Sequence, residues 1–89
     1  LDIDHDIYAA IGLALIDKME GNFEEAIEKF KNLIKNDQKN LRLYIDLANC
    51  YVEFGKNSEA EQILNDFLVL EPKNLIAKNA LGKIKNARN

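Results

Sequence analysis

Apolar residues along this chain recur at the spacing of helices rather than of strands. Near the C-terminus, one apolar stripe at helical spacing is formed by Ala77, Ala80, Leu81, Ile84 and Ala87. Helix-favouring residue types dominate, and the chain contains only one proline and four glycines. The pattern predicts an all-α fold with helices near residues 6–19, 23–36, 41–54, 57–70 and 74–87.

Turn residues stand where these helices are expected to end and begin. Gly21 and Gly55 follow the first and third helices, and glycine adopts a left-handed backbone there at little cost. Asn40 and Asn74 precede the third and fifth helices and suit helix capping, while Pro72 ends the fourth helix.

The second and fourth helices also carry the spacing of a capping box at their starts. Asn22 stands three residues before Glu25, and Ser58 stands three residues before Glu61. In such a box the two side chains cap each other's backbone amides. The spacing predicts this arrangement at both helix starts.

The sequence repeats itself with a period of 34 residues. Moving the chain along itself by this distance superposes similar residues at many positions, some of them in three copies. The pairs are Gly21 and Gly55, Glu25 and Glu59, Ala26 and Ala60, Phe30 and Leu64, Leu33 and Phe67, Ile34 and Leu68, and Asn40 and Asn74. The triplets are Leu13, Leu47 and Leu81, then Ala14, Ala48 and Gly82, then Ile16, Cys50 and Ile84. This period indicates stacked helix pairs.

On these residues the chain resembles the tetratricopeptide repeat family. The second unit carries the family signature at Tyr44, Leu47, Ala48, Tyr51, Ala60, Leu64 and Pro72. The first unit keeps Leu13, Ala14, Gly21, Ala26 and Phe30, and it departs from the signature at Ala10, Asp17 and Gln38. The resemblance covers about residues 7–87 and implies a right-handed helical-repeat solenoid of about five antiparallel helices.

The expected organisation is one domain with two repeat units and a closing helix. Residues 1–6 are expected to form a flexible acidic segment, 7–40 the first unit, 41–74 the second unit and 75–89 a capping helix. We expect burial between the second unit and the cap for Leu47, Tyr51, Leu64 and Phe67. The last helix then turns its apolar stripe to the preceding pair and its polar faces to water.

The first helix admits two alignments with the signature. The alignment without gaps assigns to the core Leu13, Ala14 and Ile16. A rival register, which needs two extra residues before Gly21, assigns to the signature Tyr8, Ile11, Gly12 and Leu15. The helix is apolar nearly all round, so one of its faces must be covered by the same chain, by a second copy or by a partner.

In tetratricopeptide domains the first helix of each pair lines a concave groove that holds a peptide or a helix. On the alignment without gaps, the resemblance implies these groove residues: Tyr8, Ile11, Leu15, Met19, Arg42, Ile45, Asn49, Val52, Glu53, Asn79 and Lys83. The same alignment adds Lys18, Ile76 and Asn86. Such a groove is apolar near its N-terminal end and polar or basic near its C-terminal end.

Patterns for catalysis or metal binding are weak in this sequence. Asp2, Asp4 and Asp6 alternate around His5 like the start of a calcium loop, but the glycine and the glutamate that the loop requires are missing. One reading is a divalent metal bound by His5 and these carboxylates. The reading we prefer is a frayed acidic N-terminus whose Asp residues favour the start of a helix. The sequence contains no phosphate loop or catalytic triad. It predicts no catalytic residue, no metal and no cofactor.

The single cysteine, Cys50, aligns with two apolar residues of the other repeat copies. This alignment predicts a buried apolar position rather than a nucleophile, which would need a neighbouring base. One cysteine cannot form an internal disulfide and says nothing about the compartment. Localisation is therefore unknown, with the cytoplasm as the default.

Charge points away from nucleic acids and membranes as partners. The net charge is −3, and the longest apolar run, residues 7–16, is too short to cross a bilayer. We expect a non-catalytic module for protein–protein interaction, an adaptor or scaffold segment of a larger protein. One alternative is self-association, because residues 1–25 hold seven acids against Lys18 whereas only cations follow Glu71. Another is a regulatory appendage of an enzyme encoded outside this stretch.

Overall fold

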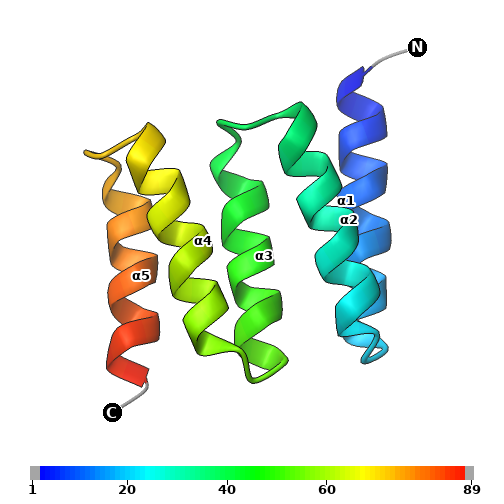
Figure 1. The fold of residues 1–89 in the computed structure, drawn as a ribbon. Coiled ribbons are helices and arrows are strands. Elements are labelled where there is room, and N and C mark those ends of the chain that lie inside the picture. Colours follow the sequence, from blue (N-terminus) through cyan, green and yellow to red (C-terminus); the bar gives the residue numbers. More distant parts are fainter. Residues whose placement is uncertain (1–2, 88–89) are drawn as a thin grey trace.

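The computed structural model describes the backbone of residues 3–87 and the side chains of residues 7–87. It contains five helices: α1 (Ile3–Met19), α2 (Phe23–Asn36), α3 (Leu41–Glu53), α4 (Asn57–Leu70) and α5 (Leu75–Ala87). Figure 1 shows them as a row of antiparallel neighbours with the two termini at opposite ends. The domain is a flat slab, measuring 43 × 30 × 15 Å along its principal axes.

The all-α prediction with five helices is confirmed, and residues 3–87 contain no strand. Helix α1 begins at Ile3, inside the segment 1–6 that we expected ahead of it. The right-handed sense of the solenoid and the limits of the two repeat units stay predictions. None of the described helices is both long and apolar enough to span a membrane.

The turns that close the two helix pairs have the same geometry. Gly21 and Gly55 adopt φ values of 83° and 81°, as their places in the repeat predict. Asn22 N donates to Asp17 O at 2.8 Å, and Lys56 N donates to Tyr51 O at the same distance. Because both helices run without interruption into identical turns, α1 and α3 correspond residue by residue at a spacing of 34. The geometry therefore supports the alignment without gaps.

Helix capping follows the prediction at two of the four expected sites. Asn40 Oδ1 accepts from Arg42 N at 3.1 Å, and Asn74 Oδ1 accepts from Ala77 N at 2.9 Å. The box expected at Asn22 does not form, since Asn22 stands at the cap of α2 but its side chain makes no cap hydrogen bond. At α4 the cap residue is Lys56, so Ser58 lies inside the helix rather than at its cap. The glycine turns fix these two helix starts through the backbone, because Asn22 N donates to Asp17 O and Lys56 N donates to Tyr51 O.

The core lies where the helices of each pair cross. Ala26 and Ala60 are fully buried and let the paired helices approach closely, while Phe30 and Leu64 fill the space beside them at 0% exposure. The four residues expected between the second unit and the cap are buried as predicted, namely Leu47, Tyr51, Leu64 and Phe67. Along α5 the stripe is buried at Ala77, Leu81 and Ile84, whereas Ala87 at the helix end is exposed.

Helix α1 departs from the expected burial. Leu13 and Ile16, expected in the core, are 57% and 50% exposed, while Ile11, expected in the groove, is 2% exposed. Ala14 is fully buried as predicted. The reason is the neighbourhood of the helix rather than its register. The matching face of α3 is covered by α2 and that of α5 by α4, but no described helix lies against this face of α1.

Candidate functional site

A hollow of ≈ 400 Å³ lies between α3 and α5. Its lining, which we call the α3–α5 hollow, consists of Ile45, Ala48, Asn49, Leu64, Ile76, Asn79, Ala80, Lys83 and Ile84. The hollow opens between two successive first helices of the repeat, where Ala48 and Ala80 leave room for a ligand. Five of the predicted groove residues therefore come together here: Ile45, Asn49, Ile76, Asn79 and Lys83.

The polar groups of the α3–α5 hollow are available to a ligand. The side chains of Asn49, Asn79 and Lys83 are exposed, and none has a hydrogen-bond or ion-pair partner within residues 7–87. Ile76, at the rim, is 63% exposed. An apolar floor with two free amides and one free ammonium group suits a peptide segment, since amides pair with its backbone and the ammonium group with a carboxylate.

A second, smaller hollow of ≈ 210 Å³ lies between α1 and the start of α3. Tyr8, Ile11 and Arg42 line it, together with Ile7, Asp37 and Asn40. Tyr8 is 64% exposed at the rim, while Ile11 is almost fully buried beneath it. Ile11 thus belongs to the core as well as to this hollow, which is a correction to its assignment as an open groove residue.

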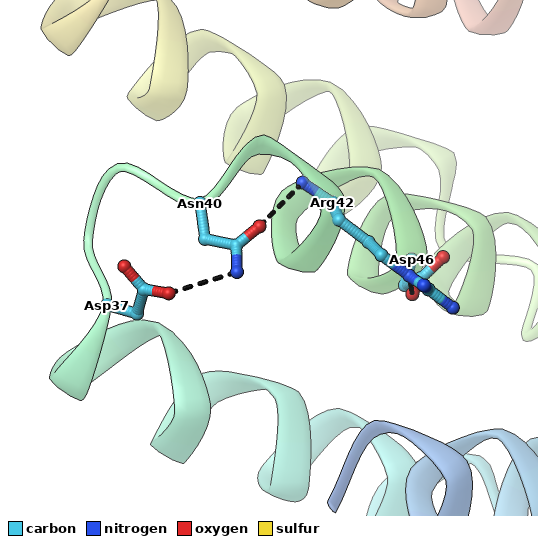
Figure 2. A network of polar contacts seen from close by, with 4 residues as sticks. All are labelled: Asp37, Asn40, Arg42 and Asp46. Atoms are coloured by element: carbon cyan, nitrogen blue, oxygen red, sulfur yellow. Dashed lines mark hydrogen bonds and ion pairs between the residues drawn. The ribbon is translucent and has the colours of Figure 1, made fainter. Parts of the chain in front are cut away.

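Arg42 is held against its own helix. Figure 2 shows its side chain running along α3 to Asp46, and the distance from Arg42 Nε to Asp46 Oδ2 is 3.3 Å. Asn40 Nδ2 donates to Asp37 Oδ2 at 3.0 Å, so that the capping asparagine also ties the turn to the end of α2. The charge of Arg42 is therefore largely compensated within the domain, and Lys83 is the better candidate for binding an acidic ligand.

The remaining predicted groove residues lie near the C-terminal ends of α1 and α3, and all but Met19 are engaged within the domain. Glu53 Oε2 lies 3.0 Å from Lys18 Nζ, an ion pair that joins α3 to α1. Leu15 and Val52 are partly buried and pack against the core. Met19 is 82% exposed at the last position of α1. These residues lie apart from the α3–α5 hollow, whose lining includes none of them.

Cys50 has the environment of a structural residue. It is fully buried, and its thiol donates to Phe23 O at 3.9 Å. Burial raises the pKa of this thiol; nearby Lys18 acts to lower it and Glu53 to raise it, but burial is the largest influence. A thiol kept protonated is a poor nucleophile, as the sequence alignment of Cys50 predicted.

Metal binding finds no support among the described side chains, which contain no cluster of three or more potential ligands. The acidic residues around His5, namely Asp2, Asp4 and Asp6, lie outside the described side chains.

Part of the hollow escaped prediction from the sequence. Ala48, Leu64, Ala80 and Ile84 were assigned to the core or to the stripe of the last helix, yet they also form the floor of the α3–α5 hollow. The available signal was the pair of alanines on successive first helices, because short side chains there leave unfilled space at the surface.

Together these features define a class of protein, a row of antiparallel helix pairs in which glycine turns close each pair and hollows lie between successive first helices. The profile of the family described as tetratricopeptide repeat matches residues 19–84, and the chain belongs to this family. The chain is similar to the TPR repeat-containing protein YpiA of Bacillus subtilis (strain 168), with 34% identity over 53 residues. That match covers 60% of this chain and 12% of YpiA. Tetratricopeptide repeats generally mediate protein–protein interaction and are typically non-catalytic.

Proposed function

We propose that this domain is a non-catalytic interaction module that holds a peptide segment or a helix of another protein in the α3–α5 hollow. The observation that carries this proposal is the lining of the hollow, an apolar floor beside two free asparagine amides and the free ammonium group of Lys83. The family gives the general role in protein interaction, and the hollow suggests where and how this chain performs it.

The chemistry of the hollow favours a ligand with apolar side chains and at least one carboxylate. Burial of apolar side chains against Ile45 and Ile76 supplies most of the affinity, at about 25 cal/mol per Å² of buried area. Asn49 and Asn79 fix the direction of the ligand backbone, and Lys83 pairs with the carboxylate. Because the hollow is small compared with a standard interface, we expect dissociation constants of about a micromolar or weaker.

Selection of random 12-residue peptides against the domain tests the proposal. We expect enriched peptides that combine apolar residues with Asp or Glu, and binding that weakens at least tenfold in Ile76→Glu. Lys83→Glu is expected to shift the selected peptides from acidic to basic. Both positions are exposed, so the melting temperature should change little in either variant. The buried Ile11 is unsuitable for this test, since a polar group there would unfold the domain.

Val69→Glu is the matched control. Val69 is 79% exposed on α4 and is not part of the lining of the hollow, so the same change in charge should leave peptide binding intact. Equal binding by Ile76→Glu and the wild type would refute the proposed site. Loss of binding in Val69→Glu to the same extent would show that added negative charge, rather than the hollow, controls capture.

A further inference from the structure

A further hollow, of ≈ 340 Å³, lies between α2 and the turn that leads from α3 into α4. We call it the α2–α4 hollow, and its floor is formed by Ile27, Tyr51 and Phe54. Tyr51 stands two residues after Asn49, which lines the α3–α5 hollow, so the two side chains point about 200° apart around the helix. The two hollows therefore open on opposite sides of α3.

The hydroxyl group of Tyr51 is left without a partner in the α2–α4 hollow. Tyr51 is only 8% exposed, yet its Oη makes no hydrogen bond to any residue of the range 7–87. Since no side-chain oxygen in that range is both fully enclosed and unpaired, this oxygen must reach solvent, and the hollow that the ring lines is its way out. Tyr44 differs, because its hydroxyl donates to Gln38 O at 2.8 Å. The Tyr51 hydroxyl is therefore free to bind a ligand.

The α2–α4 hollow already holds one cation of the chain itself. Lys56 Nζ lies 5.3 Å from the centroid of the Phe54 ring and 4.0 Å from Glu59 Oε2. An ammonium group over an aromatic face is attracted by the ring, and the carboxylate adds to this attraction. These contacts show that the surface accommodates positive charge, and they leave the rest of the lining to a ligand.

Two further carboxylates of the lining are unpaired. Glu24 and Glu28 are exposed and stand one turn apart on α2, and neither has a partner within residues 7–87. Like charges at this spacing repel each other. Lys31 also lines the hollow but makes no ion pair with either of them, and its charge offsets only one of the two. A cation between Glu24 and Glu28 would relieve the repulsion.

We propose that the α2–α4 hollow is a second docking site, which takes an arginine side chain from a segment of a partner protein. The guanidinium group binds Glu24 and Glu28 and donates to Tyr51 Oη, while the aliphatic stem packs on Ile27. Arginine fits better than lysine because its planar fork of five donors can reach several acceptors at once. This inference is independent of ligand binding in the α3–α5 hollow.

Titration with a small arginine peptide tests the inference. The probes are acetyl-Gly-Arg-Gly-amide and the same tripeptide with citrulline, which has nearly the shape of arginine without its charge. Each is added to the isotope-labelled 89-residue chain, and backbone amide shifts are followed. We expect shift changes centred on Glu28 and Tyr51 that saturate at millimolar concentrations of the arginine peptide. The citrulline peptide should bind at least tenfold more weakly, and a lysine peptide should fall between the two.

Variants of the lining separate binding from folding. Tyr51→Phe removes only the hydroxyl, which has no partner inside the domain, so the melting temperature should stay the same while the arginine peptide binds several-fold more weakly. Glu28→Gln should weaken binding by roughly fivefold or more, because a charge-assisted hydrogen bond is lost. Glu25→Gln is the matched control, since Glu25 is exposed on the same helix but does not line the hollow. Lys31→Gln removes a competing cation and should strengthen binding.

Four results would overturn the inference. Equal binding of the arginine and citrulline peptides would show that charge is not recognised. Unchanged binding in both Tyr51→Phe and Glu28→Gln, or shift changes centred on Asn79, would place the peptide elsewhere. An equal loss in Glu25→Gln would reduce the effect to the net charge of α2. Ile76→Glu, in the α3–α5 hollow, should leave binding of the arginine peptide intact, which separates this test from that of the proposed function.

Discussion

Helices α1 and α3 hold the same place in the repeat but differ in what covers them. Both end in a glycine turn with the same hydrogen bonds, and both present a leucine at the same position. Leu47 is fully buried whereas Leu13 is 57% exposed. The comparison teaches that burial in a helical array is decided by the next element along the row as much as by the residue itself.

The largest expected difference in stability is between alanine variants of these two leucines. Leu47→Ala removes a fully buried side chain and should lower the free energy of unfolding by about 2–5 kcal/mol. Leu13→Ala removes a side chain that is mostly in water already and should cost less than about 1 kcal/mol. Urea denaturation of both variants measures the difference. Similar losses at the two positions would mean that the outer face of α1 is covered in solution.

Removing the asparagine caps should lower the stability of the domain by a smaller amount. Asn40→Ala and Asn74→Ala each remove a side-chain acceptor from a helix start and should cost about 1 kcal/mol. Asn22, at the start of α2, makes no such bond, so Asn22→Ala should be close to neutral. Thermal unfolding of the three variants, monitored by circular dichroism, provides the test. A comparable loss in Asn22→Ala would indicate that its capping box forms in solution.

The ion pair between α1 and α3 should contribute less to the stability of the domain than either asparagine cap. Lys18 and Glu53 are 3.0 Å apart, and the Glu53 side chain is 52% exposed, so water and salt screen their attraction. A double-mutant cycle with Lys18→Met and Glu53→Gln should give a coupling below about 1 kcal/mol that shrinks at high salt. A coupling that is insensitive to salt would contradict an exposed pair.

The free energy of unfolding should change little with pH near neutrality and should fall only at alkaline pH. Burial raises the pKa of Cys50 above its ordinary value of 9.0, and burial with the nearby Asp66 charge raises the pKa of Tyr44 above 10.0. Above those ordinary values the unfolded chain loses its protons first, so stability present at lower pH is lost as the pH rises. Denaturation midpoints between pH 7 and pH 11 test this, and Cys50→Ala should reduce the decline.

Labelling of the thiol is an independent control for that last prediction. With Cys50 buried and protonated, thiol reagents should react at the rate of domain opening rather than at the rate of an exposed cysteine. Fast labelling under native conditions would place the thiol at the surface and contradict the assigned cause of its shifted pKa.

Much of this architecture could be predicted from the sequence because its signals are local. Gly21, Gly55, Asn40 and Asn74 act through their own turns, and the structure shows each in its expected role. The capping box expected at Asn22 is also a local signal, but the Asn22 side chain makes no cap hydrogen bond. At that helix start the observed bond of the turn runs through the backbone, from Asn22 N to Asp17 O.

The burial of α1 could not be predicted in the same way. A periodic pattern shows which residues share a face, but whether Leu13 is covered depends on an element beyond the pattern. The hollow between α3 and α5 was predictable in part, because Asn49 and Lys83 follow from the repeat register. Its depth depends on the spacing of α3 and α5, which a periodic pattern in the sequence does not give.

A slab only 15 Å thick has no central interior, and this affects how the domain loses structure. Each helix contacts mainly the helices next to it in the chain, so the stability of one helix depends on that of its neighbours. A helix at the end of the row can unfold locally while the inner helices stay folded. Amide protons of α3, which contacts α2, α4 and α5, should therefore exchange with solvent most slowly, and those of α1 at the edge should exchange sooner. A ligand that bridges α3 and α5 would slow exchange at one end of the row and leave the other end as mobile as before.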